Sequence, residues 1–308
     1  MILTLTSKLA SMMLYVVIGF LSVRFGVLKV ADSKPLSTLT VYILTPCLLL
    51  TAFQIDLTPD RLWGFIGAAA FSTVSFLVYI LMAHFLKKPF HFTPVDQATL
   101  VYPNVGNLIL PLVGMVLGEE MVFYASAIQI PFNLLVWTHG SSLIRGEKDF
   151  HLRKFLLNGN ILAVAAGLVF LGIGFRLPDV LYTTVSGLGQ MVGPASMLVV
   201  GMAIAGKDLK SIFSNKKAYL ILFFRLAVFP AVLLLLLYVS RIFRLQPQLT
   251  PILQVSMMSL AAPPAAAVSQ LAVMYDVEPV EASSYNVMGI FFCVLTLPAV
   301  IALYELLF

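Results

Sequence analysis

The chain has 308 residues, of which 60% are hydrophobic and 11% charged, and its mean hydropathy is +0.98. Soluble domains carry about 25% charged residues, so this composition excludes a soluble protein and predicts one that lives in lipid. A formal net charge of +5 could indicate a protein that binds nucleic acid. The basic residues, however, are distributed among the connections as in a membrane protein with a defined topology, so we expect no nucleic-acid partner.

Ten apolar stretches are long enough for membrane helices, because a hydrocarbon core of about 30 Å requires ~20 residues per helix. The first stretch lacks a small-residue cleavage site and is followed at once by further spans, so we interpret it as a retained helix, not a signal peptide. No long polar segment remains for a soluble domain. The predicted spans are 7–28, 35–55, 62–86, 95–117, 120–144, 155–175, 180–205, 217–240, 249–274 and 280–307.

Lysine and arginine gather in alternate connections between these spans. Short cytoplasmic loops collect basic residues, so we predict that the odd-numbered connections are cytoplasmic and that both termini lie outside. The even-numbered connections hold Arg61, Arg176, Arg241 and Arg244. The odd-numbered connections hold Arg24, Lys29, Lys34, Lys87, Lys88, Arg145, Lys148, Arg153, Lys154, Lys207, Lys210, Lys216 and Lys217.

The most charged connection, at 146–154, divides the spans five and five. Because five is odd, the two halves must enter the membrane in opposite directions. We therefore predict an all-α integral membrane protein built from two inverted five-helix repeats, 1–145 and 155–308, joined by a cytoplasmic connection at 146–154.

The fourth span of each half contains helix-breaking residues at mid-membrane depth. Proline removes a backbone donor and clashes with the preceding turn, so both helices should break there. Non-helical backbone at that depth survives only where protein or a watery cavity satisfies it, and paired interruptions in inverted halves are typical of transporter binding sites. The predicted helix-breaking residues are Pro103 and Pro111 in the fourth span, and Pro263 and Pro264 in the ninth.

Each break should expose the positive N-terminal end of a half-helix, at 105–108 and at 265–268, and such an end attracts a carboxylate. The asparagine and glutamine side chains nearby either contact the ligand or form hydrogen bonds between helices, and the residues alone leave both open. The candidate substrate-binding residues are Asn104, Val105, Gly106, Asn107, Gln129, Asn133, Pro263, Pro264, Ala265, Gln270 and Asn286.

The remaining polar residues and the two cysteines give weaker indications of function. Arg225 lies about 12 Å into its span at 1.5 Å per residue, and a functional charge, a structural pair or a snorkelling side chain explains it. Asp96 opens the fourth span, where we expect it to cap a helix. Cys47 and Cys293 are interpreted as small buried residues. We expect no metal, no cofactor and no enzymatic activity, because phosphate-loop, nucleophile-elbow and metal-ligand spacings are missing from the sequence.

The stretch from Pro103 through Pro111-Leu112 resembles the auxin efflux carrier family, whose bacterial members transport small organic acids. Further matching motifs follow the same order along nearly the whole chain. They are the motifs that begin at Gly19 (GFLSVRFG), Leu44 (LTPCL), Ser259 (SLAAP) and Glu281 (EASS).

The resemblance implies a ten-helix inverted-repeat fold in which broken helices 4 and 9 cross, similar to the bile-acid sodium symporters. It implies an elevator with helices 1, 2, 6 and 7 as scaffold and helices 3–5 and 8–10 carrying substrate, with Asn104, Asn107, Pro263 and Pro264 at the crossing. It also implies a bacterial inner-membrane location. A homodimer through the scaffold helices is left open.

We therefore expect a secondary transporter of mono- or dicarboxylates or of auxin-like aromatic acids, with lipid and the anion as its partners. An anion channel and a sodium-coupled, bile-acid-like symporter are the alternatives. The sodium-coupled relatives place a glutamate in the ninth helix, whereas residues 255–274 contain no acidic side chain, so we expect transport without sodium.

Overall fold

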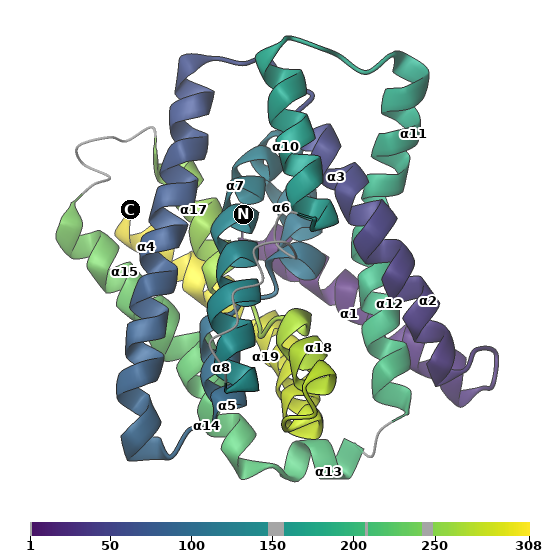
Figure 1. Ribbon diagram of the computed structural model, residues 1–308, viewed down its shortest axis with the longest axis vertical. Helices are drawn as coiled ribbons and strands as arrows, with labels where there is room; N and C mark the ends of the chain where they lie inside the picture. The colour runs from purple at the N-terminus through teal and green to yellow at the C-terminus, as the bar shows by residue number, and fades with distance from the viewer. Residues whose placement is uncertain (1, 147–156, 207–208, 242–248) are drawn as a thin grey trace.

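The computed structural model describes residues 2–146, 157–206, 209–241 and 249–308, and within these ranges the chain is helical apart from turns and one isolated β-bridge (Figure 1). The helices and helical turns of the first half are α1 (Ile2–Arg24), η1 (Val30–Asp32), α2 (Ser33–Leu39), η2 (Thr40–Leu44), α3 (Thr45–Ala52), α4 (Pro59–Phe90), α5 (Pro94–Val101), η3 (Val105–Ile109), α6 (Leu110–Leu117), α7 (Glu119–Leu135), η4 (Val136–Gly140) and α8 (Ser141–Arg145).

The described part of the second half is helical as well. It comprises α10 (Gly159–Gly172), α11 (Asp179–Gln190), α12 (Val192–Ala205), α13 (Leu209–Ser214), α14 (Lys216–Phe223), η5 (Phe224–Val228), α15 (Phe229–Ser240), α17 (Thr250–Leu260), α18 (Ala266–Met274) and α19 (Pro279–Leu307). The connection predicted at 146–154 lies, except for Gly146, outside the described residues.

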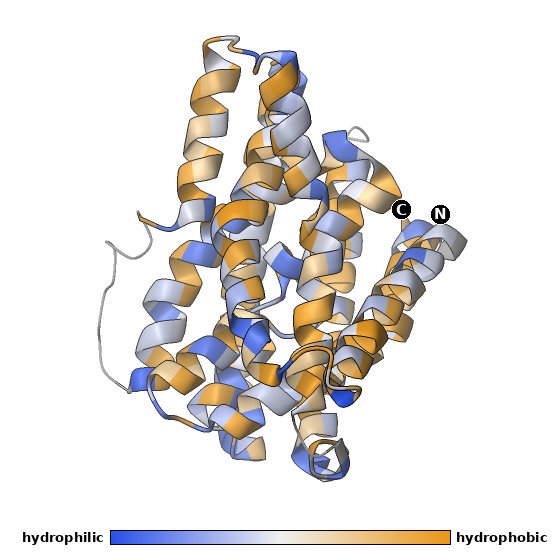
Figure 2. Cartoon of the chain, turned by 90° about the vertical axis from the view of Figure 1, so that its right-hand side faces the viewer, coloured by the Kyte–Doolittle hydropathy of each residue, from blue (hydrophilic) through white to orange (hydrophobic). Residues whose placement is uncertain are grey.

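Seven helical stretches in the described part of the chain are long and apolar enough to cross a membrane. The other three predicted spans contain shorter helices: the fourth and ninth are divided by breaks, and α10 of the sixth has 14 residues. Figure 2 shows hydrophobic residues along the helices and hydrophilic ones mostly at their ends. The chain is thus an all-α, multi-pass membrane protein.

Local sequence explains where the helices begin. Thr58 and Thr93 precede a proline at the first helical position, and each threonine side chain accepts a backbone N–H of the first turn. Asp96 completes a capping box by accepting the Thr93 N–H at 2.8 Å, which confirms its predicted capping role. The Asp96 carboxylate is fully buried and also pairs with Lys217.

The prediction that Pro111 breaks its helix is wrong, because η3 continues directly into α6 through this residue. The π-helical turns η2 and η5 likewise precede Pro46 and Pro230. A π-helical turn widens the helix by one residue, and that widening relieves the clash between the proline ring and the carbonyl one turn earlier. Only the second proline of the fourth span is accommodated in this way; Pro103 lies in a true break.

The helices pack as two groups. One contains α1, α2, α3, α10, α11 and α12, and the other contains α4, α5, α6, α7, α14, α15, α17, α18 and α19. Within the first group α1 and α12 touch through their backbones, since a Cβ on Gly201 would overlap the Val16 carbonyl oxygen. In Figure 1, α2, α11 and α12 lie on the right and α4, α14 and α15 on the left. The two groups meet where α1 contacts α6 and α19, and where α3 contacts α7.

Candidate functional site

The two helix breaks lie against each other at the centre of the molecule. The Asn104 N–H donates to the Pro263 carbonyl at 2.8 Å, and the Ala265 N–H donates to the Tyr102 carbonyl at 2.9 Å. These bonds form an antiparallel bridge between Pro103 and Pro264, which have no N–H to offer. Each break therefore satisfies the backbone groups that the other leaves unpaired, as buried non-helical backbone requires.

On one side of this crossover the half-helices α5 and α17 end, and both ends point their carbonyl groups at Arg225. The guanidinium donates to Leu100 at 3.2 Å, to Leu260 at 2.9 Å and to Ala262 at 2.8 Å. It is fully buried and lies over the Tyr79 ring, 5.3 Å from the ring centroid. The positive charge neutralises the negative ends of two helices at once, so Arg225 is a structural clamp of the crossover.

On the other side, the half-helices that begin at Val105 and Ala266 have no such partner. Neither the N-cap Asn104 nor the N-cap Ala265 accepts a first-turn N–H through its side chain, and neither first turn contains an acidic residue. The first turn of a helix leaves donors without intrahelical partners and carries a partial positive charge. Both positive ends are thus left uncapped by side chains.

These two uncapped ends border a cavity of about 90 Å³. We call it the amide cavity, because seven of its lining side chains are asparagine or glutamine: Asn104, Asn107, Gln129, Asn133, Asn158, Asn160 and Gln270. Its remaining lining residues are Val41, Gly106, Phe132, Val136, Trp137, Ala265, Ala266 and Ala267. Its lining residues include no acidic or basic side chain, so the field inside comes from backbone and amide dipoles.

The amides of the cavity are incompletely paired. Asn133 donates to Gln129 Oε1 at 3.1 Å and to the Gln129 carbonyl at 2.9 Å, one helical turn apart on α7. Gln129 is 1% exposed, yet its Nε2 has no hydrogen-bond partner in the described structure. The side chains of Asn104 and Asn107 also lack partners there. A buried donor such as Gln129 Nε2 is costly without a partner, and a ligand that accepts hydrogen bonds would satisfy it and the more accessible amides of Asn104 and Asn107.

The structure brings together most of the residues predicted for the site, and it places four elsewhere. Val105 is fully buried outside the lining of the cavity, Pro264 is bridged to Pro103, and the Pro263 carbonyl accepts the Asn104 N–H. Asn286 donates its Nδ2 to the Pro264 carbonyl at 2.9 Å, so its amide supports the break. These four residues shape the crossover without lining the cavity.

Two of the seven lining amide side chains were missed by the sequence analysis. Asn158 and Asn160 open α10, which belongs to the other group of helices, and Asn158 caps that helix by accepting the Asn160 and Ile161 N–H groups. The available signal was an Asn-Gly-Asn run within the first turns of the predicted sixth span, 155–175. Such a run is typical of a helix cap, and its approach to the crossover depends on how the two groups pack.

Comparison with known families gives the context for this geometry. A family model described as a membrane transport protein matches residues 4–150 and 147–301, and therefore nearly the whole chain. The chain belongs to this auxin efflux carrier family of membrane transport proteins. No curated protein matches the chain. The resemblance inferred from the motifs at Pro103, Leu44 and Ser259 is thus confirmed at the level of the family.

Proposed function

We propose that this transporter carries small organic anions and binds them in the amide cavity. The observation that carries the proposal is the convergence of two uncapped helix N-termini on a cavity lined by unpaired amides, while Arg225 neutralises the opposite helix ends. A carboxylate placed there would accept hydrogen bonds from first-turn N–H groups and from the Gln129 amide. The substrate class includes mono- and dicarboxylates and auxin-like aromatic acids.

The proposed architecture is ten membrane helices in two inverted five-helix repeats, with both termini outside. The matched breaks in the fourth span of each half support the repeat. The excess of lysine and arginine in odd-numbered connections supports the orientation. The start of α1 and the end of α19 lie at the same height in Figures 1 and 2, consistent with an even number of crossings. We place the protein in the bacterial inner membrane.

The proposed mechanism is an elevator, in which helices 3–5 and 8–10 move against helices 1, 2, 6 and 7. The amide cavity supports it by lying between the two groups: Val41, Asn158 and Asn160 come from one group, and the remaining lining residues come from the other. A relative displacement of the groups would therefore open and close access to the ligand. A homodimer through the stationary helices fits the same scheme.

Countertransport in proteoliposomes tests the proposal. Labelled carboxylates should accumulate when the vesicles are preloaded with the same unlabelled acid, and the corresponding uncharged primary amides should not compete. Replacing sodium by choline at constant pH should leave the rate unchanged, because α17 and α18 contain no acidic residue. A linear, ohmic anion current without countertransport would establish a channel instead, and failure of every acid to bind or move would refute the anion site.

A further inference from the structure

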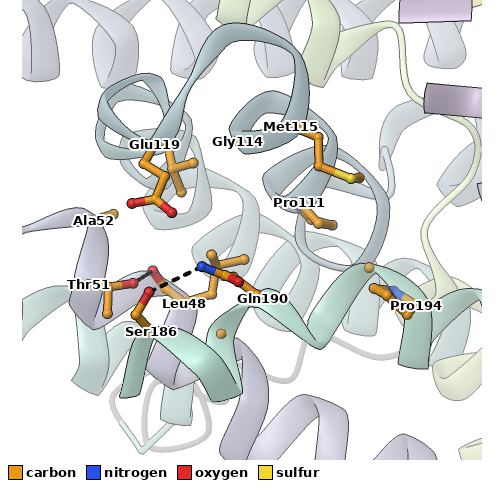
Figure 3. Close-up of a pocket in the computed structure, with 13 residues that line it drawn as sticks. Leu48, Thr51, Ala52, Pro111, Gly114, Met115, Glu119, Ser186, Gln190 and Pro194 are labelled. Carbon is orange, nitrogen blue, oxygen red and sulfur yellow. Dashed lines mark hydrogen bonds between the residues drawn. The ribbon is translucent and has the colours of Figure 1, made fainter. Parts of the chain in front are cut away.

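A second, larger cavity of about 320 Å³ lies between α3, α6 with the start of α7, and the α11–α12 pair (Figure 3). We call it the Glu119 cavity, after its one charged lining residue. It shares no lining residue with the amide cavity. The lining consists of Leu48, Thr51, Ala52, Pro111, Gly114, Met115, Glu119, Val122, Ser186, Gly189, Gln190, Gly193 and Pro194.

Polar and apolar groups are separated within this cavity. Figure 3 shows Thr51, Glu119, Ser186 and Gln190 together on one side, with Pro111, Met115 and Pro194 on the other. The volume is near the lower end of the roughly 300–1,000 Å³ typical of small-molecule sites. The shape and the segregation suit a ligand with one polar head and a compact apolar body.

The hydrogen-bonding capacity of the polar side is mainly for accepting. The Thr51 hydroxyl already donates to the Leu48 carbonyl at 2.9 Å, and Gln190 Nε2 donates to Ser186 Oγ at 3.4 Å. Both oxygens of Glu119 and the amide oxygen of Gln190 have no donor among the described residues. The Ser186 hydroxyl and the second Gln190 N–H remain as donors, while the Glu119 carboxylate adds an excess of acceptors, so a head group with donors of its own fits this side.

The charges around the cavity also favour a ligand with a positively charged head group. Glu119 has no ion-pair partner in the described part of the chain, and no lysine, arginine or histidine lines the cavity. Its neighbour Glu120, by contrast, pairs with Arg61 at 3.2 Å. Glu119 would repel an anion, whereas a protonated amine would bring a positive charge and several donors to this exposed carboxylate at the start of α7.

We propose that the Glu119 cavity binds an amphipathic amine, with the ammonium group against Glu119 and the apolar body against Pro111, Met115 and Pro194. This binding does not depend on what the amide cavity holds. One consequence does rest on the proposed function: the cavity lies beside the contact of α6 with α12, where a Cβ on Gly193 would lie 3.1 Å from Pro111 Cβ. An occupant would hold the two groups of helices at this spacing and slow transport.

Thermal stabilisation of the purified full-length protein by 2-phenylethylamine tests the proposal, with 2-phenylethanol as the uncharged probe of the same shape. We compare wild type with Glu119→Gln, and use Glu120→Gln as the matched variant one position along the same helix. Because Glu119 is exposed, the melting temperature of the Glu119→Gln protein without ligand should match that of wild type.

The amine should stabilise wild type and Glu120→Gln alike, and its apparent affinity for Glu119→Gln should fall by about tenfold, the effect of losing one charge-assisted contact. The alcohol should not distinguish the three proteins. Equal amine binding to wild type and Glu119→Gln, or no stabilisation of wild type, would overturn the site. Anion countertransport by Glu119→Gln without amine should be unchanged, which separates this test from that of the proposed function.

Discussion

The two sides of the crossover handle helix ends of opposite sign in opposite ways. Where α5 and α17 end, the carbonyl groups of Leu100, Leu260 and Ala262 are all bound by a side chain of the protein itself, Arg225. Where η3 and α18 begin, the N–H groups face a cavity, and the amide side chains of Asn104 and Asn107 have no partner in the described structure.

This difference separates folding from function. The negative helix ends are compensated permanently, so the crossover stays assembled whether or not ligand is present. The positive ends are compensated only when something negative enters the cavity. A residue on the first side should therefore matter mainly for stability, and a residue on the second side mainly for binding. Substitutions on each side of the crossover test this distinction.

The largest effect is expected at Arg225. Each hydrogen bond to a charged group contributes about 1.5–3 kcal/mol, against a total stability of roughly 5–15 kcal/mol for typical proteins. Arg225→Gln should therefore leave little folded protein in the membrane, as measured by monodisperse yield after extraction. Arg225→Lys keeps the charge but cannot reach three carbonyls with a planar fork, so its yield should be intermediate. A wild-type yield for Arg225→Gln would show that the clamp is dispensable.

A smaller effect on stability and a large one on function are expected at Asn104 and Asn107. Because neither side chain has a partner in the described structure, alanine should leave the melting temperature near that of wild type. Loss of one hydrogen bond to a bound carboxylate should weaken anion affinity by about 10- to 100-fold. Ligand titration followed by thermal shift measures both quantities on each variant.

Asn286→Ala is the matched control, since Asn286 is also a buried amide beside the break but is bonded to Pro264. Its loss should lower the melting temperature by a few degrees and leave anion affinity unchanged, the reverse of the Asn104 pattern. Wild-type affinity in both Asn104→Ala and Asn107→Ala would place the ligand elsewhere.

The smallest effect is expected at Gly106, where an added Cβ would lie 3.2 Å from Gln129 Nε2. Gly106→Ala should crowd the unpaired donor by a few tenths of an ångström and weaken anion binding about fivefold, which corresponds to about 1 kcal/mol of overpacking. Gly114→Ala is equally crowded, at 3.2 Å from Val122 Cγ2, but lies outside the amide cavity. Equal anion affinities for the two variants would contradict this placement.

Much of the crossover was predictable because its signals are local. Pro103 and the Pro263-Pro264 pair remove backbone donors wherever the helices lie, so the positions of both breaks follow from sequence, and Asn104, Asn107, Gln129, Asn133 and Gln270 do line one cavity. The misplacement of Pro111 has a local cause too, since a π-helical turn accommodates a proline without ending the helix.

The rest depends on packing that one sequence does not encode locally. That Arg225 would meet three carbonyls of two different half-helices requires the angle at which α5, α17 and η5 cross. That Asn160 would join the amide cavity requires the placement of α10 against α7. Both residues were conspicuous in the sequence or close to a conspicuous signal, but the residues that they meet lie more than 20 residues away along the chain.

The bridge between the two breaks also has a consequence for biosynthesis. The Tyr102 carbonyl and the Asn104 N–H find their partners only at Ala265 and Pro263, almost 160 residues later in the chain. At roughly 5–20 residues per second, translation leaves these groups waiting for about 8–32 s. During that interval the nascent first half has an unpaired carbonyl and an unpaired N–H group within the membrane. Water or a chaperone at the insertion machinery must form hydrogen bonds with these groups until the second half is inserted.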